Sequence, residues 1–172
     1  MKILILHKWL VAGGVERVLI NYLSVFKCLN YEVELLITND LGEKNVFQKE
    51  LPENTQYRYV FNQTYFNMWE DLRKNRKKSV FNKAKYEIFK LKDQYYYAKT
   101  LNNIIKSKDY DLIIDFSGCL DTLIRNAFFN TRSIPTVRWI HGQLNHQGHK
   151  RKIRKYQQIF SKHNKVISLC EE

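Results

Sequence analysis

The sequence has little of what marks several classes of protein. It contains two prolines and six glycines in 172 residues, which excludes collagen-like and low-complexity chains. No apolar run approaches the ~18 residues that cross a bilayer, so the sequence predicts no transmembrane helix. The apolar stretch 3–6 is too short for a signal peptide, and no small-residue cleavage site follows it, so we interpret it as a strand.

Cysteines are also few. Cys28, Cys119 and Cys170 are far apart, and there is no Cys-x-x-Cys pair or Cys/His cluster. This spacing argues against a disulfide framework and a structural zinc site. The three histidines of segment 141–149 are not spaced to share one helix face, so we expect no bound metal ion. Isolated thiols are typical of a reducing compartment and predict a cytoplasmic protein.

Acidic residues are outnumbered, because 17 Asp and Glu face 29 Lys and Arg, for a net charge of +12. Such a charge suits nucleic acid, an anionic membrane surface or phosphorylated small molecules. Segment 73–92 holds nine Lys and Arg and one acid among aromatic and aliphatic residues, and segment 149–165 holds seven and no acid. Both segments fit binding to anionic lipid or to a phosphate backbone, and both also fit a solvated helix face.

The clearest positive signal is the alternation of strand-like and helix-like segments. Short apolar runs predict strands at 3–6, 32–38, 111–116, 136–140 and 165–169, while 56–61 suits a strand or a helix. Helical spacing or the absence of breakers predicts helices at 15–26, 79–107, 120–129 and 149–162. This alternation predicts an α/β fold, a doubly wound, mainly parallel sheet with helices on both faces, with residues 1–172 as one Rossmann-like domain.

In such sheets ligands bind beyond the carboxyl ends of the strands, and the unusual residues fall there. Gly13 and Gly14 precede a helix, where backbone N–H groups attract anions; a tight turn with an acid near the helix N-terminus explains the same pattern. His141 ends a strand and can donate to a ligand hydroxyl or phosphate, or simply to a loop. Ser117 and Gly118 end another strand.

Several well-known signatures are missing. The dinucleotide fingerprint G-x-G-x-x-G and the P-loop are absent, which disfavours NAD and ATP bound by those routes. There is no G-x-S-x-G elbow and no Ser-His-Asp or Cys-His signature, so the sequence gives no support for a hydrolase.

Taken together, the motifs resemble the N-terminal domain of retaining GT-B glycosyltransferases of family 4. Segment 13–17 is similar to the family's G-G-x-E-R opening, and Trp139-Ile140-His141-Gly142 looks like the strand and histidine that face the interdomain cleft. Segments 109–114 and 166–170 are similar to two further strands of that domain. The resemblance covers nearly the whole chain.

The resemblance implies transfer of a sugar from a nucleotide-sugar donor to a lipid-linked or growing saccharide acceptor, as in polysaccharide or glycolipid synthesis. It implies no cofactor besides the donor as co-substrate, and no essential metal. In that family the first domain mainly binds acceptor, and a second domain holds the nucleotide and a pair of glutamates spaced by seven residues. No such second domain lies within the 172 residues, so we expect an acceptor-side fragment that is inactive alone. We expect it in the cytoplasm, with an anionic membrane surface as a candidate partner.

By resemblance, His141 is the predicted catalytic residue, hydrogen-bonded to the transferred sugar. Gly13 and Gly14 are predicted to approach the donor diphosphate through backbone N–H groups. The remaining predicted substrate-binding residues are Glu16, Arg17, Ser117, Gly118 and Gly142. Gly142 departs from the family pattern, where Asp or another polar residue often follows the histidine.

Two alternatives from other classes stay open. A stand-alone nucleotide- or nucleic-acid-binding module would use the +12 charge, although no RNA-binding aromatic motif is present, which makes nucleic acid the less favoured partner. A subunit that completes a partner glycosyltransferase in trans would expose an apolar face.

Overall fold

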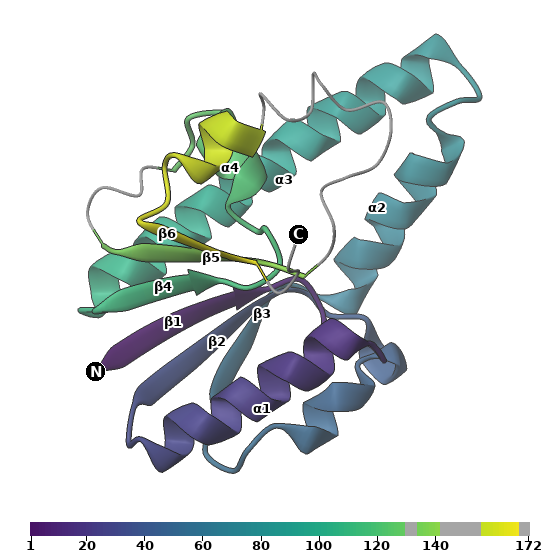
Figure 1. Cartoon of the computed structure of the whole chain (residues 1–172). Coiled ribbons are helices and arrows are strands. Elements are labelled where there is room, and N and C mark those ends of the chain that lie inside the picture. The colour runs from purple at the N-terminus through teal and green to yellow at the C-terminus, as the bar shows by residue number, and fades with distance from the viewer. Residues whose placement is uncertain (130–133, 142–155, 169–172) are drawn as a thin grey trace.

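The computed structural model describes residues 1–129, 134–141 and 156–168. Its strands form one parallel sheet in the order β3-β2-β1-β4-β5-β6 (Figure 1). The strands are β1 (Lys2–His7), β2 (Glu32–Asn39), β3 (Gln56–Phe61), β4 (Leu112–Asp115), β5 (Thr136–Ile140) and β6 (Lys165–Ser168). The predicted doubly wound parallel sheet is confirmed, and pairing with β2 makes the ambiguous segment 56–61 a strand.

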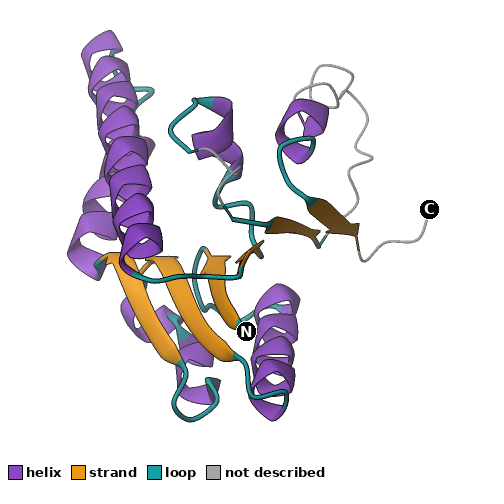
Figure 2. Ribbon diagram, turned by 90° about the vertical axis from the view of Figure 1, so that its left-hand side faces the viewer, coloured by secondary structure: helices purple, strands orange, loops and turns teal. Residues whose placement is uncertain are grey.

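Helices cover both faces of the sheet, as Figures 1 and 2 show. The helices are α1 (Gly14–Cys28), α2 (Gln63–Asn75), α3 (Val80–Ser107), α4 (Asp121–Arg125) and two 3-10 helices, η1 (Gly42–Lys44) and η2 (Val46–Glu50). Residues 156–160 form a further helical turn. None of the described helices combines the length and the apolar character needed to cross a bilayer.

Strand β1 shows why its apolar run is continuous. Leu4 and Leu6 pack with α3 and α4 on one face of the sheet, whereas Ile3 and Ile5 pack with α1 and η2 on the other. All four side chains are at most 1% exposed. Because successive strand side chains point to opposite faces, a strand covered on both faces needs an apolar residue at every position. Each such burial contributes about 1.5–3 kcal/mol.

The strand order creates a switch point between β1 and β4. From β1 the chain builds outward through β2 and β3, and then crosses back to place β4 on the other side of β1. The helices that follow β1 and β4 therefore lie on opposite faces, and ligands of doubly wound sheets bind beyond the carboxyl ends of such a pair of strands. His7 ends β1 and Ser117 follows β4, so the topology brings both residues to this switch point.

The sequence analysis did not predict α2, which forms a hairpin with α3. Asn62 caps α2 by accepting a hydrogen bond from the Tyr65 N–H (2.9 Å), and Ser79 caps α3 by accepting one from the Asn82 N–H (3.0 Å). These caps satisfy backbone donors that the first turn of a helix leaves free. The hairpin lies where aromatic and charged residues alternate without a clear period.

Two predicted helices differ in length from the observed ones. The helix expected over 120–129 ends at Arg125, because the chain turns away through Ala127, whose φ of 56° is left-handed. Of the helix expected over 149–162, residues 156–160 are helical, and 149–155 lie outside the described residues. The end of the last predicted strand, at 169, also lies outside them.

Candidate functional site

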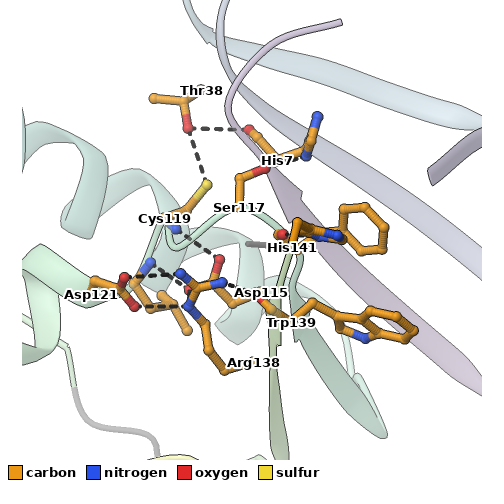
Figure 3. A network of polar contacts seen from close by, with 11 residues as sticks. His7, Thr38, Asp115, Ser117, Cys119, Asp121, Arg138, Trp139 and His141 are labelled. Atoms are coloured by element: carbon orange, nitrogen blue, oxygen red, sulfur yellow. Dashed lines mark hydrogen bonds and ion pairs between the residues drawn. The ribbon is translucent and has the colours of Figure 1, made fainter. Parts of the chain in front are cut away.

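His7 stands at the centre of a polar cluster at the switch point. Its side chain is 1% exposed, and its Nδ1 is hydrogen-bonded to the Ser117 hydroxyl. Its Nε2 lies 3.5 Å from Oε1 of Glu16, an ion-pair distance without the geometry of a full hydrogen bond. Figure 3 shows His7, Ser117 and His141 at the same end of the sheet. The cluster thus joins β1, the first turn of α1 and the loop after β4.

Glu16 is a buried carboxylate in this cluster. Burial by itself raises the pKa of Glu16, but the contact with His7 and a backbone N–H of the helix start outweigh it. The net pKa of Glu16 is therefore lowered from its ordinary value, and the group is anionic at neutral pH. A buried anion fixed at a helix N-terminus holds the facing imidazole in place.

The two glycines before α1 have different surroundings. A Cβ on Gly13 would lie 2.4 Å from Oε2 of Glu16, so any larger residue there would displace the carboxylate that faces His7. A Cβ on Gly14 would meet nothing within 4 Å. Gly13 therefore leaves room for the Glu16 carboxylate, whereas Gly14 faces open space beside the free N–H groups of the helix start.

His141 follows β5 and is half-buried against aromatic rings. Its Nε2 donates to the Phe116 carbonyl (2.8 Å), and its ring centroid lies 4.4 Å from that of Phe116 and 6.0 Å from that of Trp139. Burial lowers the pKa of His141 below its ordinary value, so the ring is neutral at pH 7. Since the carbonyl only accepts, Nε2 carries the proton and Nδ1 is an acceptor. Among the described residues Nδ1 has no hydrogen-bond partner.

The turn after β4 is held by Asp115, which is fully buried. Its carboxylate accepts the backbone N–H groups of Cys119 (2.7 Å) and Leu120 (2.9 Å). Burial raises the pKa of Asp115 despite these hydrogen bonds and the nearby Arg138 guanidinium. Because the carboxylate of Asp115, at the start of the turn, binds two backbone N–H groups at its end, it fixes the position of Ser117 relative to His7.

Gly118 is constrained by an ion pair next to this turn. Arg138 binds Asp121 through Nε and Nη2, each at 3.0 Å. Gly118 has a φ of 73°, and a Cβ there would lie 2.3 Å from Nη2 of Arg138 and 2.6 Å from Oδ2 of Asp121. The glycine therefore fits both the left-handed backbone and the close approach of the ion pair.

Two predicted site residues are not part of the cluster as described. Arg17 points toward η2, where it forms an ion pair with Glu50 and lies over the Phe47 ring, 4.6 Å from its centroid. Gly142 lies outside the described residues. The structure thus brings Gly13, Glu16, Ser117 and His141 to one place around His7. Gly14 and Gly118 directly follow Gly13 and Ser117 in the chain, and His7 had not been assigned to the site by the sequence analysis.

A cavity of about 270 Å³ adjoins this cluster, between the α2–α3 hairpin and the ends of β2 and β3. Aromatic rings and a few polar groups line it, among them Trp9, Tyr65, Trp69, Lys90, Asp93 and Thr38. Thr38 connects the two sites, because its hydroxyl donates to the His7 carbonyl (3.3 Å), a bond drawn in Figure 3.

The polar wall of this cavity is built around Asp93. Its carboxylate accepts a hydrogen bond from the Tyr65 hydroxyl. Burial raises the pKa of Asp93, although the hydrogen bond opposes the shift. No signal in the sequence identifies this cavity, because its walls come from α2, α3, α4 and the ends of β2 and β3, which only the tertiary structure assembles. His7 had a usable signal, a polar residue at the end of a buried apolar strand.

Comparison with known proteins shows which solved structures have a similar fold. No protein-family model matches the chain, and no curated protein sequence matches it. Among solved structures, it is similar to a lipopolysaccharide outer core galactosyltransferase, WaaB, in its apo form, with a TM-score of 0.53, 16% identity and 94% of this chain covered. The chain has a glycosyltransferase-like fold. It spans 42% of the length of that galactosyltransferase.

Two further structures are similar at lower scores. One is an alpha-glucosyltransferase in complex with UDP and a 13-mer DNA (TM-score 0.44, 13% identity, 98% of this chain and 37% of that one). The other is apo UGT2 of Phytolacca americana (TM-score 0.45, 10% identity, 83% of this chain and 30% of that one). The glycosyltransferase part of the predicted resemblance is confirmed at the level of the fold, whereas family 4 and the retaining mechanism stay predictions.

Proposed function

We propose that this domain is the acceptor-binding half of a retaining glycosyltransferase, which moves a sugar from a nucleotide-sugar donor to a lipid-linked or growing saccharide. The observation that carries the proposal is the cluster of His7, Glu16, Ser117 and His141 at the switch point of a glycosyltransferase-like fold. Ligands of doubly wound sheets bind at such points. The cluster brings an imidazole acceptor, a buried carboxylate and a helix start to this one point.

Each group has a task in this proposal. Nδ1 of His141 accepts a hydrogen bond from a hydroxyl of the transferred sugar and orients it, so that positioning carries much of the catalysis. The open space at Gly14 lets the donor diphosphate reach the N–H groups at the start of α1. Glu16 keeps His7 in place beneath them and acts as a positioning residue. The nucleotide sugar is a co-substrate, and the proposal assigns no metal ion or resident cofactor.

The aromatic cavity is the proposed acceptor site. Its volume of about 270 Å³ lies just below the ~300–1,000 Å³ of pockets for drug-sized ligands, which suits a terminal sugar. Trp9 and Trp69 offer rings for the apolar faces of a sugar, and Asp93 and Lys90 offer partners for its hydroxyls. The hydrogen bond from Thr38 to the His7 carbonyl places this cavity next to the cluster.

The rest of the enzyme is proposed to come from a second, nucleotide-binding domain of the same chain, without which this half is inactive. We also propose a cytoplasmic location and a role in cell-surface polysaccharide or glycolipid synthesis. Two alternatives make different predictions. A basic nucleotide- or nucleic-acid-binding module would not bind a saccharide in the cavity. A subunit acting in trans would be active only together with a partner chain.

Saturation-transfer NMR with methyl glycosides of common hexoses tests the acceptor site directly on this domain. We expect transfer to at least one glycoside, loss of that transfer in Trp9→Ala, and retention in Met68→Ala, an exposed residue of α2 outside the cavity. Absence of transfer to every glycoside, together with RNA binding that weakens steeply with salt, would instead support the binding-module alternative.

A further inference from the structure

Helix α3 carries an apolar stripe on its outer face. The stripe consists of Phe81, Ala84, Ile88, Leu91 and Tyr95, whose spacing of three and four residues places them on one side of a helix. All five are exposed, with Phe81 at 76%, Ile88 at 57%, Leu91 at 54% and Tyr95 at 62%. The opposite side of α3 packs against α2 through Tyr86 and Phe89, and further along against the sheet through Leu101 and Ile104. The helix therefore has two apolar faces, and no described residue covers the outer one.

The amino-terminal end of this stripe lies at the tip of the α2–α3 hairpin. Figures 1 and 2 show the two helices extending past the sheet, with the tip away from the rest of the domain. The connection 76–79 is exposed throughout, and Val80, the first residue of α3, is 86% exposed. Large apolar side chains at the end of a projecting hairpin contribute nothing to the core.

Unpaired positive charge surrounds the stripe. Lys85 and Lys92 each directly follow a stripe residue, and the tip adds Arg76, Lys77 and Lys78. Within the described ranges none of these five forms an ion pair; the Arg76 guanidinium lies over the Tyr86 ring, 5.2 Å from its centroid. A merely solvated face would not expose Phe81, Ile88 and Leu91 between these cations. An apolar face bordered by Lys and Arg is the pattern of a helix that lies in a lipid interface.

We propose that the α2–α3 hairpin docks this domain on an anionic lipid bilayer, with the outer face of α3 in the headgroup region. Phe81, Ile88 and Leu91 enter the boundary of the acyl chains, while Lys85 and Lys92 bind anionic headgroups. This surface is separate from the sugar site and its function does not depend on sugar transfer. If the proposed function also holds, the cavity behind the same hairpin faces acceptors carried by that membrane.

The charges favour a bilayer over a second copy of the chain. An antiparallel pairing of two α3 stripes centred on Ile88 would bring Lys85 of one copy beside Lys92 of the other, a like-charge contact. Each chain also carries a net charge of +12, which opposes association of two copies and favours an anionic partner.

Co-sedimentation of the domain with vesicles tests the proposal. We expect binding to vesicles of phosphatidylcholine mixed with phosphatidylglycerol, and at least about tenfold weaker binding to phosphatidylcholine alone. Lys85→Glu/Lys92→Glu should weaken binding by about tenfold or more. The control Lys27→Glu/Lys49→Glu changes the net charge equally on two exposed lysines of α1 and η2, away from the hairpin, and should retain binding within about twofold.

A second pair of variants tests insertion of the apolar side chains. Phe81→Ser/Ile88→Ser should lose most of the binding, whereas Val25→Ser/Leu29→Ser, two exposed apolar residues around the end of α1, should keep it. Because all four positions are exposed, thermal unfolding should stay close to that of the wild type. Ile88→Trp should show blue-shifted fluorescence on binding and quenching by brominated lipid.

Three results would overturn the proposal. One is absence of wild-type binding to anionic vesicles. Another is an equal loss in the two lysine pairs, which would mean that net charge alone drives binding. The third is a dimer in light scattering that dissociates in Phe81→Ser/Ile88→Ser while vesicles are not bound, which would make the stripe an interface between copies.

Discussion

The imidazole of His7 is hydrogen-bonded through Nδ1 to the hydroxyl of Ser117, a residue 110 positions further along the chain. The bond connects the ends of two adjacent strands at the point where the direction of strand addition reverses. On its other side, His7 faces the carboxylate of Glu16 at 3.5 Å. A polar residue so completely buried needs fixed partners, and Glu16 is one of the two that His7 has.

Glu16→Gln should reduce the free energy of unfolding at pH 7 by about 1–3 kcal/mol, because it removes a buried charge that faces His7. The lowered pKa of Glu16 means that its stabilising effect is complete above the ordinary value of 4.5 and is lost as the pH falls through the lowered value. Urea unfolding at a series of pH values should therefore show the variant and the wild type converging in acid. Glu50→Gln, at an exposed ion pair, is the control and should cost less than about 1 kcal/mol. A constant gap between Glu16→Gln and wild type down to acid pH would contradict this account.

Gly13→Ala and Gly14→Ala should have opposite effects on stability. The new methyl at Gly13 would meet Oε2 of Glu16 at 2.4 Å and push the carboxylate from His7, at a cost of about 1–3 kcal/mol. The methyl at Gly14 meets nothing, and alanine favours a helix by up to about 1 kcal/mol over glycine. Thermal unfolding measures both. If Gly14 approaches the donor diphosphate, Gly14→Ala in an enzyme that contains this domain should raise the KM for the donor without loss of stability.

Gly118→Ala should destabilise the fold by about 2 kcal/mol or more, since it combines a left-handed φ of 73° with a clash against Arg138 and Asp121. Gly42→Ala is the matched control, because Gly42 also has a positive φ of 58° but would meet only the flexible side chain of Gln63. The difference between the two free energies of unfolding measures the clash itself. Equal losses in both variants would show that the Arg138–Asp121 pair moves freely out of the way.

His141→Ala, in an enzyme that contains this domain, should lower kcat by about 10²–10³-fold with little effect on folding, if Nδ1 orients the transferred sugar. Burial lowers the pKa of His141 from its ordinary value of 6.5, so the neutral ring persists below that pH. Activity should stay level as the pH falls to about 6.5, and decline only where the ring gains a proton and loses its acceptor. The free energy of unfolding should also decrease as the pH falls below the ordinary value of 6.5, since the unfolded chain takes up a proton at His141 before the folded chain does.

A variant that keeps the ring but not its nitrogens separates packing from chemistry. His141→Phe preserves an aromatic contact with Phe116 and Trp139, and should be folded yet as inactive as His141→Ala. Full activity in His141→Phe would show that the ring only fills space.

The strands were predictable because parallel strands covered on both faces need unbroken apolar runs, such as Ile3 to Leu6. His141 could be singled out for a related reason, since it follows directly after such a run, and the glycine pair because it lies between the first run and the helix predicted after it. Helix α2 was missed because its aromatic and charged residues follow no simple period, and its place is fixed by packing against α3. Arg17 had suggested a ligand contact, and only the fold shows that it pairs with Glu50.

The sequence by itself determined the order of most strands and helices, with α2 the main exception, because local hydrophobic spacing and turn residues depend on neighbours in the chain. The tertiary structure alone decided which of the polar strand ends meet. His7 and Ser117 come together because β4 returns to the side of β1 that β2 leaves free, a choice made by packing both faces of the sheet. It also decided which face of α3 is buried, since both faces are apolar and packing against α2 and the sheet covers one, which leaves Phe81, Ile88 and Leu91 exposed on the other.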